Sequence, residues 1–156
     1  MAVYTPEGYK KQMDAFGAGL PKAIAEATFV AGQQLNVDIV GRVFRVGGTK
    51  DIDGGTRGYR SESWIREREA KGLQIRNVDL EFNGDLKRSI KLFQTKQSVA
   101  ELKIVGDLNV KKARGNEDLY EQENGAEVFE ASIKEEKRAR EAFDKVISEY
   151  INKFFD

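Results

Sequence analysis

Helical periodicity at both ends of the chain constrains this sequence more than any other feature. From about Pro6 to Arg45, apolar side chains recur every three or four residues. Pro21 predicts a kink or an interruption there, because proline lacks a backbone N–H and clashes with the preceding turn. The segment 132–156 opens with a capping box and carries one broad apolar face. We therefore expect a long helix at each end.

The middle of the chain predicts a small antiparallel sheet. Residues 89–95 and 99–105 alternate apolar with polar side chains, and three residues between them suit a hairpin connection. Residues 75–82 suit a strand or an extended run, and 126–131 a short edge strand. Ser61 to Gly72 predicts a short helix before the sheet, started by serine and stopped by glycine. The predicted class is α+β, with the C-terminal helix packed on the sheet.

The length of 156 residues, 17.6 kDa, suits a single domain. Its expected parts are an N-terminal helical region at 1–46, a flexible glycine-rich loop at 47–60, the small helix and sheet at 61–131, a long polar loop at 106–125 within that part, and the C-terminal helix at 132–156. We expect both loops to be mobile in the free monomer, because glycine and polar residues supply few side chains that fix a core.

Composition removes several classes of chemistry. The chain has no Cys and no His, so we expect no disulfide, no thiolate nucleophile and no Ser-His or Cys-His triad. Lys and Arg number 26 and balance 26 Asp and Glu, which gives no global attraction to nucleic acid or to a membrane. No signal peptide or membrane-spanning run is evident, which predicts synthesis in a cytoplasm. We predict no enzyme activity, cofactor, metal or membrane association.

One short motif superficially suggests calcium. Asp51 and Asp53 would take positions 1 and 3 of an EF-hand loop, and Glu62 would take position 12. Positions 5 and 6 fail, because Gly55 supplies no ligand and Thr56 replaces the required glycine. A solvated turn is the favoured interpretation.

A hydrolytic carboxylate pair is the second candidate for chemistry. Such a pair needs two carboxylates across a cleft, one with a pKa raised by burial. The best candidates, Asp79, Glu81 and Asp85, fall at alternating or turn positions that we expect to face solvent. Catalysis is therefore disfavoured.

Charge is distributed unevenly. The segment 57–76 carries six bases and three acids, whereas 117–130 carries six acids and no base. A neutral chain of this kind can bind a second copy head to tail. The only tryptophan lies within the basic segment and suits either an anchor for its helix or an interface contact. The predicted interface residues are Arg60, Trp64, Arg66, Arg68, Glu117, Glu121 and Glu123.

Within the segment from Gly58 to Ile90, a turn of the form Leu-x-x-Asn-Gly-x-Leu-x-x-Ser-Ile precedes the predicted hairpin. Its residues are Leu80, Asn83, Gly84, Leu86, Ser89 and Ile90. The segment resembles the middle of small neck and tail-completion proteins of tailed bacteriophages, the virion morphogenesis group, in which Thr usually stands at the position of Asn83. Further on, Tyr120, Gly125 and Phe129 match an aromatic residue, a glycine and a Phe-containing strand, although the basic residue often found before that Phe is absent.

The resemblance implies a structural protein of the virion. Such proteins form rings that join the capsid connector to the tail or terminate the tail tube, around the DNA channel and without sequence-specific binding. It implies other connector and tail proteins as partners and a homo-oligomeric ring, of six copies by the usual tail symmetry or of twelve to match a connector. The alternative is a cytoplasmic nucleic-acid or regulatory binding module that uses the basic segment 57–76. A carboxylate hydrolase is a third and weaker hypothesis.

Overall fold

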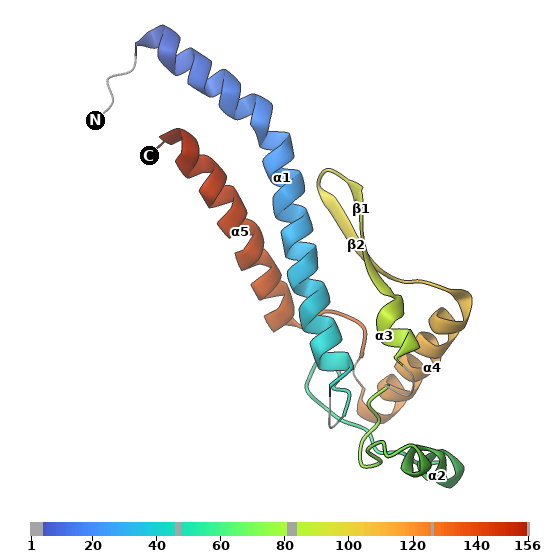
Figure 1. The fold of residues 1–156 in the computed structure, drawn as a ribbon. Helices are drawn as coiled ribbons and strands as arrows, with labels where there is room; N and C mark the ends of the chain where they lie inside the picture. The colour runs from blue at the N-terminus through green and yellow to red at the C-terminus, as the bar shows by residue number, and fades with distance from the viewer. Residues whose placement is uncertain (1–4, 46–47, 81–83, 126, 156) are drawn as a thin grey trace.

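The computed structural model describes residues 5–45, 48–80, 84–125 and 127–155, apart from the side chains of residues 123 and 124 (Figure 1). Its class is α+β, as predicted. In chain order the elements are α1 (Pro6–Val43), α2 (Glu62–Ala70), α3 (Asp85–Ser89), β1 (Ile90–Lys96), β2 (Val99–Ile104), α4 (Asp107–Asn124) and α5 (Ile133–Phe155).

Helix α1 is continuous over 38 residues. Thr5 caps its start, because the Thr5 side chain accepts a hydrogen bond from the Gly8 N–H at 3.1 Å. Pro21 lies inside the helix without ending it, so of the two predicted outcomes the interruption is wrong; the helix bends in its N-terminal part, in agreement with the predicted kink (Figure 1). A proline removes one backbone hydrogen bond, and packing against α5 holds the turns on either side. The Tyr150 hydroxyl, for example, donates to the Phe16 carbonyl at 2.5 Å.

Helix α1 forms the middle layer of the molecule. Helix α5 runs antiparallel along one side of it, and the hairpin lies against the other side (Figure 1). Two glycines permit these approaches. A Cβ on Gly19 would stand 2.5 Å from the Tyr150 hydroxyl, and one on Gly32 would stand 2.7 Å from Leu92 Cδ1. The predicted place of the C-terminal helix is thereby corrected, since its main contact is with α1 and not with the sheet.

The predicted hairpin is confirmed. Strands β1 and β2 are antiparallel, with Ile90 opposite Ile104 and Leu92 opposite Leu102. Residues 75–80 form only an isolated bridge between Asn77 and Gly58, so they do not make a third strand, and residues 81 and 82 lie outside the described residues. The predicted edge strand is also wrong where the structure describes it, because residues 127–131 are irregular.

The largest error concerns residues 106–125, which form helix α4 and not a polar loop. The helix begins after Gly106 and ends at Gly125, whose φ of 69° is typical of a helix C-terminus. Its buried residues, Ala113 and Tyr120, are seven positions apart and so lie on one face, while most of its other residues are exposed. That narrow apolar stripe is hard to detect within a polar sequence, but it suffices because the rest of the domain supplies the partner.

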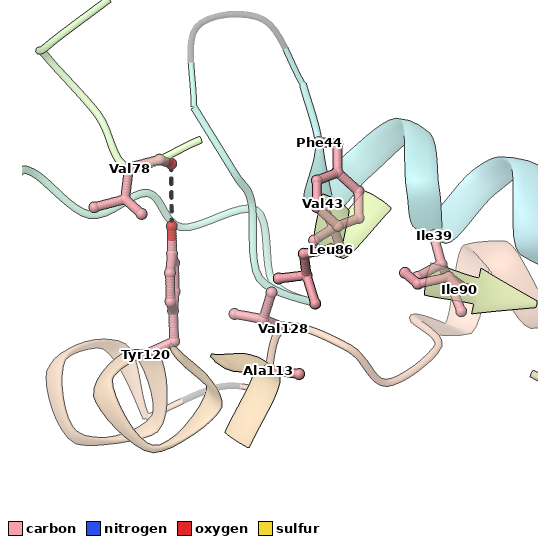
Figure 2. Close-up of a cluster of buried hydrophobic side chains, with 9 residues drawn as sticks. All are labelled: Ile39, Val43, Phe44, Val78, Leu86, Ile90, Ala113, Tyr120 and Val128. Carbon is pink, nitrogen blue, oxygen red and sulfur yellow. Dashed lines mark hydrogen bonds between the residues drawn. The ribbon is translucent and has the colours of Figure 1, made fainter. Parts of the chain in front are cut away.

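The main core is a cluster of buried side chains around the C-terminal end of α1 (Figure 2). It forms where the C-terminal end of α1 meets α3, α4 and the irregular chain around Val128. The Tyr120 hydroxyl donates to the carbonyls of Thr49 at 3.3 Å and Val78 at 3.5 Å, which ties α4 to two loops. The core residues are Ile39, Val43, Phe44, Val78, Leu86, Ile90, Ala113, Tyr120 and Val128.

Candidate functional site

A buried ion pair stands at the centre of the segment that the sequence singles out. Helix α2 begins as predicted, with the Ser61 hydroxyl accepting from the Trp64 N–H at 3.4 Å. One helical turn later, Arg68 turns inward and its side chain is 1% exposed. Its Nη2 lies 2.7 Å from Asp79 Oδ2, and its Nε donates to the Gln74 carbonyl at 2.9 Å. The pair joins α2 to the chain that precedes α3.

The Asp79 carboxylate has several further partners. It accepts hydrogen bonds from Gln74 Nε2 at 2.7 Å and from the Tyr59 hydroxyl at 3.0 Å, and the Arg68 guanidinium lies 4.8 Å from the centre of the Tyr59 ring. Burial, together with the neighbouring Asp79 charge, raises the pKa of Tyr59 to about 12. Asp79 was expected to face solvent, and that prediction is wrong: the residue is 7% exposed.

This network does not resemble a hydrolytic site. The carboxylate candidates are not brought together, because Asp85 pairs with Arg88 at 2.5 Å on the surface and Glu81 lies outside the described residues. Asp79 meets a guanidinium, an amide and a phenol instead of a second carboxylate. Such an arrangement neutralises the buried charges and fixes the chain around them.

A second polar centre joins the C-terminal end of α1 to the start of α5, near the main core. We call this end of the molecule the base. Arg42 Nε lies 2.8 Å from Glu135 Oε1, and Arg42 Nη1 donates to the carbonyls of Lys50 at 2.9 Å and Val128 at 2.8 Å. Glu135 also accepts from the Ser132 N–H at 2.8 Å, which confirms the predicted capping box. Burial would raise the pKa of Glu135, but the bonds to Arg42 and Ser132 outweigh it and hold that pKa below its usual 4.5.

The role of Arg42 was missed at the level of sequence. A base in the last turn of a helix is ordinary, since it favours the negative end of the helix dipole. Nothing local indicates that its guanidinium reaches carbonyl groups more than eighty positions away. The only signal in the sequence was Glu135, the acid three residues after Ser132 in the capping box, because a carboxylate there can also pair with a base.

The glycine-rich loop is anchored by a buried aspartate. Asp51 is 1% exposed, and its Oδ1 accepts from the N–H groups of Asp53 at 3.0 Å and Gly55 at 2.7 Å. The predicted turn is therefore present, but its first residue is buried and not solvated. Among the described residues, no three Asp, Glu, His or Cys side chains are placed to share a metal ion.

An open, largely charged cavity of about 720 Å³ lies beside this loop, between the end of α1 and the start of α5. Ion pairs cross it: Arg138 Nε lies 3.0 Å from Asp38 Oδ2, in addition to the pair formed by Arg42 and Glu135. These charges are matched within the chain. Among the described lining residues, the buried carboxylates of Asp51 and Glu135 are both satisfied by hydrogen bonds within the chain.

The predicted basic interface residues divide into two kinds. Arg60 is exposed, and the side chain of Arg66 is 76% exposed and pairs with Glu62 at 3.3 Å. Trp64 is 38% exposed at the edge of a hollow of about 300 Å³. Arg68 is the exception, because its guanidinium is buried against Asp79 and is not accessible to another molecule. Its assignment to an interface is therefore withdrawn.

The predicted acidic interface residues also divide. The Glu117 carboxylate accepts from the N–H groups of Val128 at 2.9 Å and Phe129 at 3.1 Å, so its role is internal. Glu121 is exposed, and the side chain of Glu123 lies outside the described residues. A hydrogen bond with Glu130, helped by the other acids nearby, raises the pKa of Glu127 to about 7. The acidic segment thus carries less negative charge at neutral pH than its composition suggests.

The turn residues that carry the phage resemblance have structural roles. Gly84 adopts a φ of 74° directly before α3, a conformation that favours glycine. Leu86 is 6% exposed in the core, and the Ser89 hydroxyl donates to the Leu86 carbonyl at 2.6 Å. Ile90 belongs to the same core, Leu80 and Phe129 pack against it, and Asn83 lies outside the described residues.

Comparison of the chain with family models, curated proteins and solved structures found no match. Among the described residues, no helix is both long enough and apolar enough to cross a membrane.

Proposed function

We propose that this chain is a structural subunit of a tailed-bacteriophage virion, forming a ring at the neck or tail end. In that role it would join the capsid connector to the tail or terminate the tail tube, around the DNA channel. The resemblance of the segment that begins at Gly58 motivates the proposal. Six copies remain the favoured ring, with twelve as the second possibility.

The observation that carries the proposal is the amount of exposed surface. The chain exposes 10,454 Å². A compact monomer of 17.6 kDa exposes about 7,900 Å² by the usual scaling of surface with mass. The excess of roughly 2,500 Å² belongs to an elongated molecule and is comparable to what a subunit buries against neighbours in an assembly.

The internal polar groups support the same proposal. The buried charges at Arg68, Asp79, Arg42 and Glu135 are all paired within the chain. Paired groups of this kind fix the chain segments around them, and none of these four is an unpaired nucleophile or base.

The alternative, a nucleic-acid binding module, is less well supported. Arg68 is buried, and the Arg57 guanidinium lies 5.8 Å from the centre of the Tyr120 ring. The segment 57–76 then presents four exposed bases and three exposed acids, nearly neutral in sum. Phosphate binding depends on an excess of exposed positive charge, which this surface lacks.

Labelling of virions tests the proposal directly. An antibody against the chain, applied to particles released from cells that express the phage genes around it, should mark the junction of head and tail or the tail end in electron micrographs. A chain absent from purified particles would contradict the proposal. Salt-sensitive binding to DNA, measured by fluorescence anisotropy, would favour the alternative.

A charge reversal tests the expected head-to-tail contact. Arg60→Glu with Arg66→Glu should weaken ring assembly without unfolding the subunit, because both side chains are exposed. Adding Glu121→Lys should restore assembly in part. Lys10→Glu with Lys11→Glu is the matched control and should assemble normally. Arg68 is left unchanged, since its substitution would test folding. Native mass spectrometry reads the copy number, and unaltered assembly of the first variant would contradict the charge contact.

A further inference from the structure

Helix α4 carries its charges in an order that opposes its own dipole. Its bases, Lys111, Lys112 and Arg114, lie in the N-terminal half, and its acids, apart from one in the first turn, lie in the C-terminal half. The last turn holds Glu121 and Glu123 and no base. Because the C-terminal end of a helix carries partial negative charge, this order lowers the stability of the helix. Such a cost indicates a use for these charges outside the helix.

The outward charges of α4 are not used inside the chain. Several exposed bases elsewhere pair with an acid on the same element, as Arg66 does with Glu62 at 3.3 Å. Lys111, Lys112 and Asp118 are exposed as well, but within the described residues they belong to no ion pair. Their charges are therefore available to another molecule.

Lys111 and Asp118 lie on the same side of α4. They are seven residues apart in sequence, which is close to two turns, or about 10 Å along the helix axis. At that separation they cannot pair with each other. The buried residues Ala113 and Tyr120 define the inward face of the helix. Lys111 and Asp118 therefore stand on the outward face, one on each side of its midpoint near Gly115, which is also exposed.

We infer that a second copy of this chain packs its α4 antiparallel against this outward face, around a two-fold axis beside Gly115. Reversing the helix exchanges the two ends of the charge pattern, so Lys111 of each copy meets Asp118 of the other. The acidic half of each helix then lies beside the basic half of the other, at the positive end of that helix dipole. Leu119, which is 40% exposed, lies on the same face and adds apolar contact next to the charges.

The order of the charges favours this occupant over others. A nucleic acid or an anionic membrane would be repelled by the acidic half of α4, and a peptide of a single charge sign would be repelled by one of the two halves. A parallel copy would place like charges opposite each other. The fitting partner has the same two blocks of charge in reverse order, and a second α4 in the antiparallel orientation supplies them.

The area of this contact makes it weak by itself. Helix α4 has 18 residues and so is about 27 Å long, which with a width of about 10 Å gives about 270 Å² on each partner. A stable interface buries about 800 Å² on each partner. A two-fold contact also joins two copies and goes no further. It is thus distinct from the proposed head-to-tail contact of Arg60 and Arg66, and it does not rest on the ring.

Cross-linking detects a weak two-fold contact directly. The chain has no native cysteine, so an introduced one has a clean readout. Gly115→Cys places one thiol of each copy beside the axis, and we expect a disulfide-linked dimer under mild oxidation at high protein concentration. Lys145→Cys, at an exposed position of α5, is the control and should link at least about tenfold more slowly. Equal rates for the two variants would overturn the inference.

Charge reversal tests the pairing of Lys111 with Asp118. On the Gly115→Cys background, Lys111→Asp brings carboxylates together and Asp118→Lys brings ammonium groups together. Each change alone should slow linkage by about tenfold or more. Both changes in one chain should restore linkage, because each base again meets an acid. A mixture of the two single variants should link into mixed dimers for the same reason, whereas Lys145→Asp should leave the rate unchanged.

The mixed dimers separate a lost contact from a folding defect, because mixing two misfolded chains would not restore linkage. Mass spectrometry identifies them, and circular dichroism checks that each variant is folded. Single variants that link like their Gly115→Cys parent, or a mixture that stays slow, would reject the antiparallel pair. Loss of linkage with intact virion labelling would reject the pair alone, and the converse would reject the virion role alone.

Discussion

The base and the arm of this molecule are stabilised in different ways. At the base, nine buried side chains form the main core. Two ion pairs with little exposure lie beside it: Arg42 with Glu135, which are far apart in sequence, and Arg68 with Asp79, which belong to neighbouring segments. In the outer arm, formed by residues 6–27 of α1 and the C-terminal half of α5, the only described buried residues are Ala23 and Ala27. There the helices meet through Gly19 and a group of stacked and edge-on rings around Phe16.

The difference shows how one small domain can hold an extended shape. The base combines the main core with polar groups that are satisfied within the chain. The arm depends on close backbone approach and leaves much apolar surface in contact with water. Changes at the base should therefore lower the free energy of unfolding more than changes on the outer arm.

The largest expected effect is that of a charge in the core of the base. Leu86→Asp places a carboxylate where the side chain is 6% exposed, which costs several kcal/mol and should unfold most of the protein. Leu108→Asp is the matched control, because Leu108 is 67% exposed. Thermal melts by circular dichroism compare the two. A Leu86→Asp protein that melts like the parent would place Leu86 outside the core.

The second prediction separates two arginines of one helix. Arg68→Ala leaves Asp79 buried without its cation, so we expect a loss of about 3–5 kcal/mol in the free energy of unfolding. Arg66→Ala removes an exposed i,i+4 pair and should cost no more than about 0.5 kcal/mol. Urea titration measures both. If the two variants lost equal free energy of unfolding, the buried pair of Arg68 and Asp79 would contribute no more to stability than the exposed pair of Arg66 and Glu62.

The third prediction concerns two glycines of α1. A Cβ on Gly32 would stand 3.3 Å from the Ala100 Cβ and closer to Leu92, so Gly32→Ala should displace the hairpin and cost about 1–3 kcal/mol, less what the helix gains from alanine. Gly41 has open space, and Gly41→Ala should stabilise by up to about 1 kcal/mol. Opposite signs in urea titration are the expected result. A stabilising Gly32→Ala would show that the hairpin is held loosely.

The smallest expected effect is a dependence on pH. The pKa of Glu135 is lower in the folded chain than its usual 4.5, so the carboxylate contributes stability above that value and loses it as pH falls through the lower, folded pKa. Glu135→Gln should flatten this part of the acid unfolding curve while lowering stability at neutral pH. Glu136→Gln, on the exposed side of the same turn, is the control. Parallel acid curves for the parent and Glu135→Gln would contradict the assignment.

Local patterns in the sequence determined much of this protein. The helix starts at Thr5, Ser61 and Ser132 follow from capping side chains that act within four residues. The hairpin follows from the alternation of apolar and polar residues in β1 and β2, because the two strands are adjacent in sequence and pair with each other. The left-handed turn at Gly84 likewise needs only a glycine, which the sequence displays directly.

Only the tertiary structure decided which residues are buried outside those patterns. The polar sequence of α4 becomes helical because Ala113 and Tyr120 join a core whose other members come from distant parts of the chain, which no local window contains. Arg68 and its neighbour Arg66 are the same residue type two positions apart, yet one is buried against Asp79 and the other is exposed. A charged side chain can be buried only where an oppositely charged partner offsets the cost of removing it from water. The fold determines where such a partner lies.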